Sequence, residues 1–329
     1  MPSDSRRVLV LGGTGHIGAA IARQLASDGF EVRASGRSPE PRANLAGVDV
    51  QQLAGDDSHT TNLEAWMQDC SLVVDAATPY PVWRHGARGS HVVAAARQRA
   101  RTLIALAKER RAALIHISSF TTLPATGSIQ DKLRLATVRG MHPYFEVKET
   151  VEREMLNALR TGMKGCVINP AACFGPYDLK PADQGFVPML LRGKVAGTLN
   201  HPVNVIDVRD VASYLSAIVQ QNLPFPQVPL LGHNLSIDAL TRQICALAGV
   251  PAPTFRAPLL LSLASAYWAE SAAALAGRRT PWPSLPILLT AAGRNMALSK
   301  EQIALGIRPR PLEQTLIDAI SWYRQIGHC

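Results

Sequence analysis

The feature that most constrains the fold is a run of three evenly spaced glycines near the start of the chain. Four apolar residues, Val8–Leu11, lead directly into Gly12, Gly15 and Gly18. An apolar run that enters a glycine turn and then a helical pattern indicates a buried parallel strand followed by a helix. Gly12 would permit the tight turn, Gly15 would let a pyrophosphate approach the backbone, and Gly18 would let the helix pack closely. The free N–H groups at the start of that helix favour a phosphate, so we predict a dinucleotide site.

Further strand patterns alternate with helical patterns along the first half of the chain. Strands are expected at 7–11, 31–35, 48–56, 71–77, 113–119 and 165–171, and helices at 16–29, 91–110 and 142–161. This alternation predicts an α/β fold, a Rossmann-type doubly wound parallel sheet.

Beyond Pro176 the regular alternation fades and prolines become frequent. We therefore expect a smaller, interleaved C-terminal substrate-binding region, made of 176–203 and 225–329. The segment 205–220 has a helical pattern and should return to the main sheet. The dinucleotide-binding Rossmann domain would then comprise 1–175 and 204–224.

The end of the second strand decides which nucleotide the site prefers. An NAD site usually has an acid there, about 20 residues past the glycines, to accept hydrogen bonds from the ribose. This chain has Gly36 and then Arg37, which is 19 residues beyond Gly18, and Glu31 stands at the wrong end of the strand. A guanidinium suits a 2′-phosphate, so we predict NADP(H). The alternative is a solvated loop arginine.

Topology adds residues that would line the dinucleotide. Asp56 ends the third strand and could meet the adenine edge, whereas Ala76 and Ala77 end the fourth strand and would run beside the ribose and pyrophosphate. The predicted cofactor-binding residues on these grounds are Gly12, Thr14, Gly15, His16, Ile17, Gly18, Arg37, Asp56, Ala76 and Ala77. His16 could equally be a variable position between the glycines.

A tyrosine and a lysine four residues apart are the candidate catalytic pair. Tyr144 and Lys148 would lie one turn apart on the same face of the helix at 142–161, as many inert pairs do. Ser118 and Ser119 stand at the carboxyl end of the fifth strand. Such a serine followed by Tyr-x-x-x-Lys on the next helix resembles the short-chain dehydrogenase/reductase superfamily.

Other motifs make the chain resemble the extended class of that superfamily. "NPAACFGP" (169–176), "DVRDVA" (207–212) and the helix–turn–helix expected at 298–323 are similar to its motifs. "VRASGRSPE" resembles the NADP-type turn of dihydroflavonol reductase-like enzymes. The resemblance extends to the NAD-dependent epimerase/dehydratase family.

The resemblance implies a role for each catalytic residue. Ser119 would orient the substrate oxygen, with Ser118 as the alternative, and Tyr144 would exchange its proton. Lys148 would lower the pKa of the tyrosine. It also implies that Lys148 and Pro170 contact the cofactor.

Some positions depart from the pattern of the extended class. Ala95 stands where an asparagine is usual, Asn169 where an arginine is usual, and Asp207 where a histidine is usual. The first change concerns the proton relay, and the other two could reflect a different substrate. No carboxylate follows the serine pair in "SSFTT", which argues against dehydration of a nucleotide sugar.

We therefore expect an NADPH-dependent oxidoreductase that reduces a ketone or aldehyde. The alternatives are a sugar-nucleotide epimerase or related isomerase and a non-catalytic NADP-sensing protein. The loop 78–90 should form a wall of the substrate pocket, where Trp83, Arg84 and His85 would bind an aromatic or anionic group or simply pack.

Composition limits the partners of the chain. Its 329 residues carry a formal net charge of +9, but the basic residues are scattered and do not interleave with aromatic ones, so nucleic acid is not expected. The groups Arg97–Arg101 and Lys108–Arg111 indicate solvated helix faces. A homodimer through the helices at 91–110 and 142–161 is an alternative.

The five cysteines fit no metal pattern and favour a reduced, cytoplasmic protein. We expect no metal. The apolar segment 257–277 has Glu270 as its single charge. Its length approaches that of a spanning helix, but we favour a mostly buried helix over membrane contact.

Overall fold

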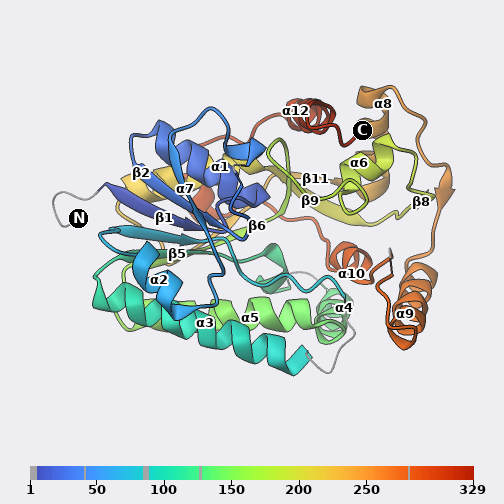
Figure 1. Cartoon of the computed structure of the whole chain (residues 1–329). Helices are drawn as coiled ribbons and strands as arrows, with labels where there is room; N and C mark the ends of the chain where they lie inside the picture. Colours follow the sequence, from blue (N-terminus) through green and yellow to red (C-terminus); the bar gives the residue numbers. More distant parts are fainter. Residues whose placement is uncertain (1–5, 41, 84–88, 126–127, 281) are drawn as a thin grey trace.

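The computed structural model describes residues 6–40, 42–83, 89–125, 128–280 and 282–329. Its centre is a parallel seven-stranded sheet with strand order β10-β6-β5-β4-β1-β2-β3 (Figure 1). The strands are β1 (Arg7–Leu11), β2 (Glu31–Gly36), β3 (Val50–Ala54), β4 (Leu72–Asp75), β5 (Ala113–Ile117), β6 (Gly165–Pro170) and β10 (Gln227–Leu230). The first six confirm the predicted strands. The seventh, β10, was missed and brings residues 227–230 into the main sheet rather than the C-terminal region.

Helices cover both faces of this sheet. α1 (His16–Ser27) and α7 (Val208–Gln220) lie on one face, and α2 (Thr60–Trp66), α3 (Gly89–Glu109) and α5 (Pro143–Arg160) lie on the other (Figure 1). The side chains of β1 alternate between the two layers, because Val8 and Val10 pack with α1 and α7 whereas Leu9 and Leu11 pack with α2 and α3. The fold class is therefore the Rossmann-like one that the sequence predicts.

α5 carries the candidate catalytic pair, and its start is set by local sequence. His142 is the N-cap and its ring accepts a hydrogen bond from the Tyr144 N–H, while Pro143 occupies the first turn, where a missing N–H costs nothing. Arg160 in the last turn suits the negative end of the helix dipole. The helix matches the predicted bounds and places Tyr144 in its first turn.

A second layer of structure lies beyond the carboxyl ends of the main strands. It contains a sheet of β7 (Ala172–Phe174), β9 (Pro202–Asp207) and β11 (His233–Ser236), a pair of β8 (Gly197–Thr198) and β12 (Phe255–Arg256), and the helices α6 (Phe186–Leu191), α8 (Ile237–Ala248) and α12 (Leu312–Gln325). The predicted helix at 205–220 is wrong at its start, because residues through Asp207 are strand. Asp207 caps α7 by accepting a hydrogen bond from the Arg209 N–H. The short helix α11 (Lys300–Ala304) and α12 confirm the helix–turn–helix.

A third cluster joins α4 (Ile129–Gly140), α9 (Leu259–Leu275) and α10 (Leu285–Ala291) to the start of α5. In Figure 1 these helices lie at one end of the molecule, with α9 at the edge. The prediction that 257–277 is mostly buried is wrong: in α9 only Ala266 and Glu270 are buried. No helix among the described residues is long and apolar enough to cross a membrane.

Candidate active site

The Ser119 and Tyr144 side chains meet at the carboxyl end of β5. Ser119 follows that strand and opens the short helix η2 (Phe120–Thr122), and the Tyr144 hydroxyl donates a hydrogen bond to Ser119 Oγ over 3.3 Å. Both side chains are buried. The sequence placed these residues 25 positions apart, and the crossover from β5 to α5 brings their oxygens together.

Thr121 completes the hydrogen bonding of the serine and was not predicted. Its N–H and its hydroxyl both donate to Ser119 Oγ, over 3.2 and 2.9 Å. On another side, the half-exposed Tyr80 ring packs edge-on against the Tyr144 ring, with centroids 5.1 Å apart. Tyr80 belongs to the loop predicted to form a wall of the substrate pocket. The hydroxyl pair is thus held by an oriented threonine and flanked by an aromatic ring.

Ser118 points to a different set of partners. Its hydroxyl donates to the Glu152 carboxylate over 2.5 Å, and the same oxygen accepts hydrogen bonds from the Thr122 hydroxyl and the Asn169 side-chain amide. Asn169 also donates to the Ser119 carbonyl oxygen. Of the two serines that the sequence left open, Ser119 contacts Tyr144, whereas Ser118 belongs to a buried network behind it.

Two residues that depart from the family pattern are buried and make internal contacts. Asn169 is fully buried and satisfied by Glu152 and Gln227. Asp207 is also buried; it caps α7 and pairs with Arg209. Both side chains are used inside the protein, and the expectation that these positions reflect a different substrate stays a prediction.

Lys148 lies one turn beyond Tyr144 on the buried side of α5. Its ammonium donates to the carbonyl oxygens of Ile117 and Ser118, over 3.3 and 3.5 Å, at the end of β5. Burial lowers the pKa of Lys148 to about 8, although Asp75 and Glu152 act to raise it. The Lys148 ammonium, with a lowered pKa, therefore lies at the carboxyl ends of the strands, where a dinucleotide would bind.

The expectation that Lys148 lowers the pKa of Tyr144 stays a prediction, because other groups set the pKa of this phenol in the structure. Burial raises the pKa of Tyr144 well above its usual range, and the hydrogen bonds with Ser119 and Thr121 lower it only in part. The lysine ammonium bonds to backbone carbonyls and not to the phenol. Tyr144 is thus protonated at neutral pH.

A buried charged cluster lies beneath the site. Arg99 of α3 donates two hydrogen bonds to Asp75 at the end of β4 and a third to Asp57, and His116 Nδ1 lies 3.1 Å from Asp75. Arg99 holds the pKa of Asp75 well below its usual range even though burial acts to raise it. The prediction that Arg97–Arg101 is a solvated helix face is wrong at Arg99, which is buried. Ala95 is exposed on the same helix. Arg99, and not Ala95, reaches the strand ends through its hydrogen bonds with Asp75.

The glycine turn forms a cradle that fits a pyrophosphate. Gly12 has φ +69°, and a Cβ there would lie 2.9 Å from the Ala76 carbonyl oxygen, while a Cβ on Gly18 would lie 2.1 Å from the Gly12 oxygen. Gly15 caps α1 without any side-chain hydrogen bond, so the helix start presents bare N–H groups. The cradle brings Gly12 and Ala76 together. Of the other predicted residues near the glycines, Thr14 precedes α1, and His16 and Ile17 are its first two residues.

The end of β2, which the sequence predicts to select the nucleotide, is open. A Cβ on Gly36 would lie 2.3 Å from the Thr14 hydroxyl oxygen, so β2 ends against the glycine turn. Arg37 follows with an exposed side chain. Asp56, on the neighbouring strand end, is largely exposed, and hydrogen bonds from Ser58 lower its pKa, with a smaller lowering from Arg37. The arginine and the aspartate therefore border one open edge of the cradle.

In the loop 78–90, residues 84–88, which include Arg84 and His85, lie outside the described residues, and α3 begins at Gly89. Trp83 Nε1 donates to the Thr280 carbonyl oxygen, and the Arg279 guanidinium lies 4.8 Å from the centre of its ring. This contact corresponds to the packing alternative for Trp83.

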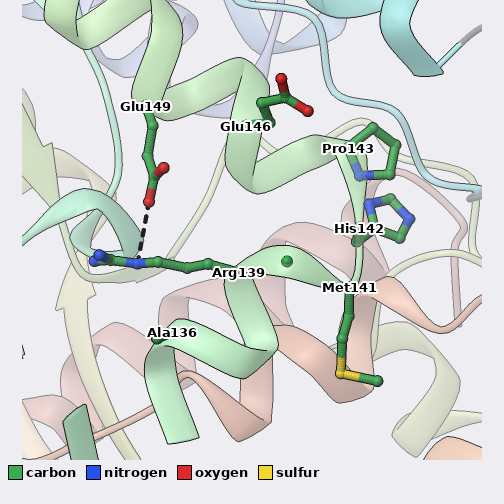
Figure 2. Close-up of a pocket in the computed structure, with 8 residues that line it drawn as sticks. Ala136, Arg139, Met141, His142, Pro143, Glu146 and Glu149 are labelled. Atoms are coloured by element: carbon green, nitrogen blue, oxygen red, sulfur yellow. Dashed lines mark ion pairs between the residues drawn. The ribbon is translucent and has the colours of Figure 1, made fainter. Parts of the chain in front are cut away.

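Two arginines hold the backbone that follows Ser119. Arg139 of α4 donates to the Thr121 and Leu123 carbonyl oxygens, and Arg294 donates to those of Phe120 and Leu123. Neither was predicted, because each is distant from Ser119 in sequence. Arg139 also pairs with Glu149 over 3.2 Å at the edge of a surface pocket of about 660 Å³ (Figure 2). That pocket is lined by Ala136, Arg139, Gly140, Met141, His142, Pro143, Glu146 and Glu149.

A doubly wound sheet with this glycine cradle and this serine–tyrosine–lysine arrangement defines an extended short-chain dehydrogenase/reductase. Residues 8–228 match the model of the NAD dependent epimerase/dehydratase family, and the chain belongs to that family. Membership of this family indicates that the protein is an enzyme of the NAD(P)-dependent oxidoreductase or epimerase type.

Relatives resemble the chain over almost its whole length. A putative dihydroflavonol 4-reductase of Synechocystis sp. is 28% identical over 97% of this chain and 95% of its own. Sterol demethylase protein B of Methylococcus capsulatus is 24% identical over 97% and 98%. The structure of UDP-glucose 4-epimerase from Bifidobacterium longum, solved with NAD+ and UDP, superposes with a TM-score of 0.71 at 16% identity, over 98% of this chain and 99% of that one. This last likeness shows that the fold is shared.

Proposed function

We propose that the protein is an NADPH-dependent reductase that converts a ketone or aldehyde into an alcohol. The observation that carries the proposal is the buried Tyr144 hydroxyl, 3.3 Å from Ser119 Oγ. Burial raises the pKa of this phenol, so the hydroxyl keeps its proton until a substrate oxygen gains negative charge. A protonated donor beside a second hydroxyl suits the reduction of a carbonyl.

Each residue would have one task. Ser119, oriented by Thr121, would donate a hydrogen bond to the carbonyl oxygen, and Tyr144 would transfer its proton to that oxygen. Lys148 would hold the ribose hydroxyls next to the site, since its ammonium lies at the end of β5. The bound nicotinamide would supply the hydride. The buried network around Glu152 and Asn169 would keep the Ser119 backbone in place.

NADP(H) is proposed over NAD(H) because of the residues at the end of β2. Gly36 and Arg37 stand where an NAD site has a carboxylate. An exposed guanidinium on the open edge of the cradle can form paired hydrogen bonds with a 2′-phosphate. The names of the two whole-length relatives, a putative reductase and a sterol demethylase protein, support oxidoreductase chemistry.

The second candidate is a nucleotide-sugar epimerase or related isomerase with tightly held NAD(P). The family match and the fold shared with UDP-glucose 4-epimerase favour it. An enzyme of that type regenerates its nucleotide in every turnover, so it would consume no NADPH.

The two candidates differ in nucleotide consumption. Nucleotide-free protein would be mixed with NADPH and a panel of ketones and aldehydes, and absorbance at the reduced nicotinamide band would be followed. A parallel set would contain UDP-sugars and be analysed for epimers. Stoichiometric NADPH oxidation with alcohol formation supports the reductase. Epimers without net oxidation would replace it with the second candidate.

A further inference from the structure

The helix α9 carries apolar residues on all sides, among three serines and one glutamate, yet is barely buried. Its single charge, Glu270, is 2% exposed and accepts hydrogen bonds from the Ser284 N–H and hydroxyl. A helix that is apolar on all sides is normally enclosed by protein or in contact with lipid. In α9, however, Leu260, Leu261 and Trp268 are between 67% and 79% exposed, and Leu275 is 91% exposed.

The exposed residues form one continuous stripe. Leu260, Ala264 and Trp268 are spaced four apart, and Ala272 and Leu275 continue the row for two more turns, so they stack along one side of the helix. The opposite side carries Leu259, Leu263 and Tyr267, which pack in the cluster with α10 and α4. The free stripe therefore contains no charged residue from one end of α9 to the other.

Exposed large apolar residues gather in this part of the molecule. Seven of the twelve found among the described residues belong to α4, α9 or the segment between α9 and α10. They are Ile129, Leu133, Leu260, Leu261, Trp268, Leu275 and Trp282. Figure 1 shows α4, α9 and α10 together at one end of the molecule. Apolar surface concentrated in this way marks an interaction site.

We propose that the exposed stripe of α9 docks on the surface of a lipid bilayer that contains anionic lipids. Basic residues with exposed side chains adjoin both ends of the helix. Arg256, which pairs with Asp238 over 2.9 Å, precedes it. Arg278 and Arg279 follow it, and the Arg279 guanidinium lies over the Trp83 ring. The one acid within α9, Glu270, is buried. Tryptophans suit the boundary between headgroups and acyl chains, and arginines near it attract anionic headgroups.

Charge favours a bilayer over a second copy of the chain. Another copy would bring the same arginines and the same net charge of +9 to the contact, whereas an anionic surface complements both. The helix would lie on the bilayer and not cross it, because α9 has 17 residues and does not qualify as a span. The inner side of α9 shares its apolar cluster with Tyr144 and Phe145, so docking would bring the start of α5 near the bilayer.

The test is sedimentation of the full chain with vesicles of phosphatidylcholine, with and without phosphatidylserine. Leu261→Gln with Trp268→Gln would remove apolar contacts, and Arg278→Gln with Arg279→Gln would remove charge. The matched control is Ile303→Gln with Ile317→Gln, which changes exposed apolar residues on α11 and α12. Each variant should stay folded, because all the changed side chains are exposed, and thermal melts check this.

We expect the wild type to sediment with the phosphatidylserine vesicles and the control to match it. Each α9-side variant should lower the partition coefficient about tenfold or more, and added salt should weaken binding of the wild type more than that of the arginine variant. The proposal is overturned if the wild type does not bind, or if the Leu261 and Trp268 variant binds equally well. If the wild type forms a dimer but does not bind vesicles, and the Leu261 and Trp268 variant is monomeric, the stripe would be assigned to self-association instead.

Discussion

The Tyr144 hydroxyl donates a hydrogen bond to Ser119 Oγ over 3.3 Å, and both side chains are buried where β5 and α5 meet. Because Thr121 donates twice to the same serine oxygen, the serine is left to give its own proton to a further acceptor. A carbonyl oxygen placed beside the pair could accept from Ser119 and then from Tyr144.

Tyr144→Phe should lower kcat about 10²- to 10⁴-fold, since the substituted ring cannot transfer a proton. Binding of NADPH, followed by fluorescence, should stay near the wild-type level. Tyr214→Phe is the matched control: it removes a buried hydroxyl that bonds to the Ile307 carbonyl oxygen, away from the site, so turnover should be unchanged. Wild-type turnover by Tyr144→Phe on a carbonyl that the wild type reduces would exclude the proton-transfer role.

The two neighbouring serines should respond in opposite ways. Ser119→Ala should lower kcat/KM at least tenfold while stability changes little. Ser118→Ala should leave Glu152 without its shortest hydrogen bond and lower the free energy of unfolding by about 1–3 kcal/mol, with a smaller effect on turnover. Paired kinetics and urea denaturation measure both. If Ser118→Ala were the variant that lost activity, the assignment of the two serines would be reversed.

The depressed pKa of Lys148 predicts a pH dependence of stability. In the folded chain this pKa is lowered to about 8 from the ordinary lysine value of 10.5, so between these values the unfolded chain binds more protons. The lysine's contribution to the free energy of unfolding should therefore rise with pH across that window. The unfolding free energy of the wild type minus that of Lys148→Met should increase by about 1–3 kcal/mol from pH 7 to pH 10. A difference that stays constant or falls with pH contradicts the buried-ammonium assignment.

Removal of Arg99 should leave Asp75 as a buried charge without its main partner. Arg99→Ala is expected to lower the free energy of unfolding by about 3–5 kcal/mol. Arg97, two residues earlier on α3, has a side chain that is 42% exposed and pairs with Glu154 over 3.7 Å, so Arg97→Ala should cost within about 1 kcal/mol. Chemical denaturation compares the two, and equal effects would show that Arg99 does not neutralise Asp75.

The sequence predicted the parts of the fold that depend on residues close together along the chain. The apolar run Val8–Leu11, the glycines after it and the Tyr–Lys spacing on α5 each specify their own structure within a few residues. They were therefore found at the predicted places. The strand β10 was missed because it is short and interrupted by Pro229, and it joins the sheet only through pairing with β6.

The partners that complete the site depend on contacts between distant segments. Glu152, Arg139 and Arg294 reach the residues around Ser119 through tertiary packing, and no spacing rule relates them to it. Arg99 resembled its solvated neighbours in sequence, and only the position of α3 against β4 buries it. The exposure of α9 was misjudged for the opposite reason, since apolar composition usually means burial.

The proposed preference for NADPH rests on Arg37 at the end of β2, and a titration tests this central claim directly. Nucleotide-free wild type and Arg37→Ala would each be titrated with NADPH and with NADH. The account predicts that the wild type binds NADPH at least tenfold more tightly, that the nucleotide exchanges freely, and that Arg37→Ala loses most of the difference. Tighter binding of NADH, or NAD that cannot be removed from the protein, would contradict the role of Arg37 and favour the epimerase.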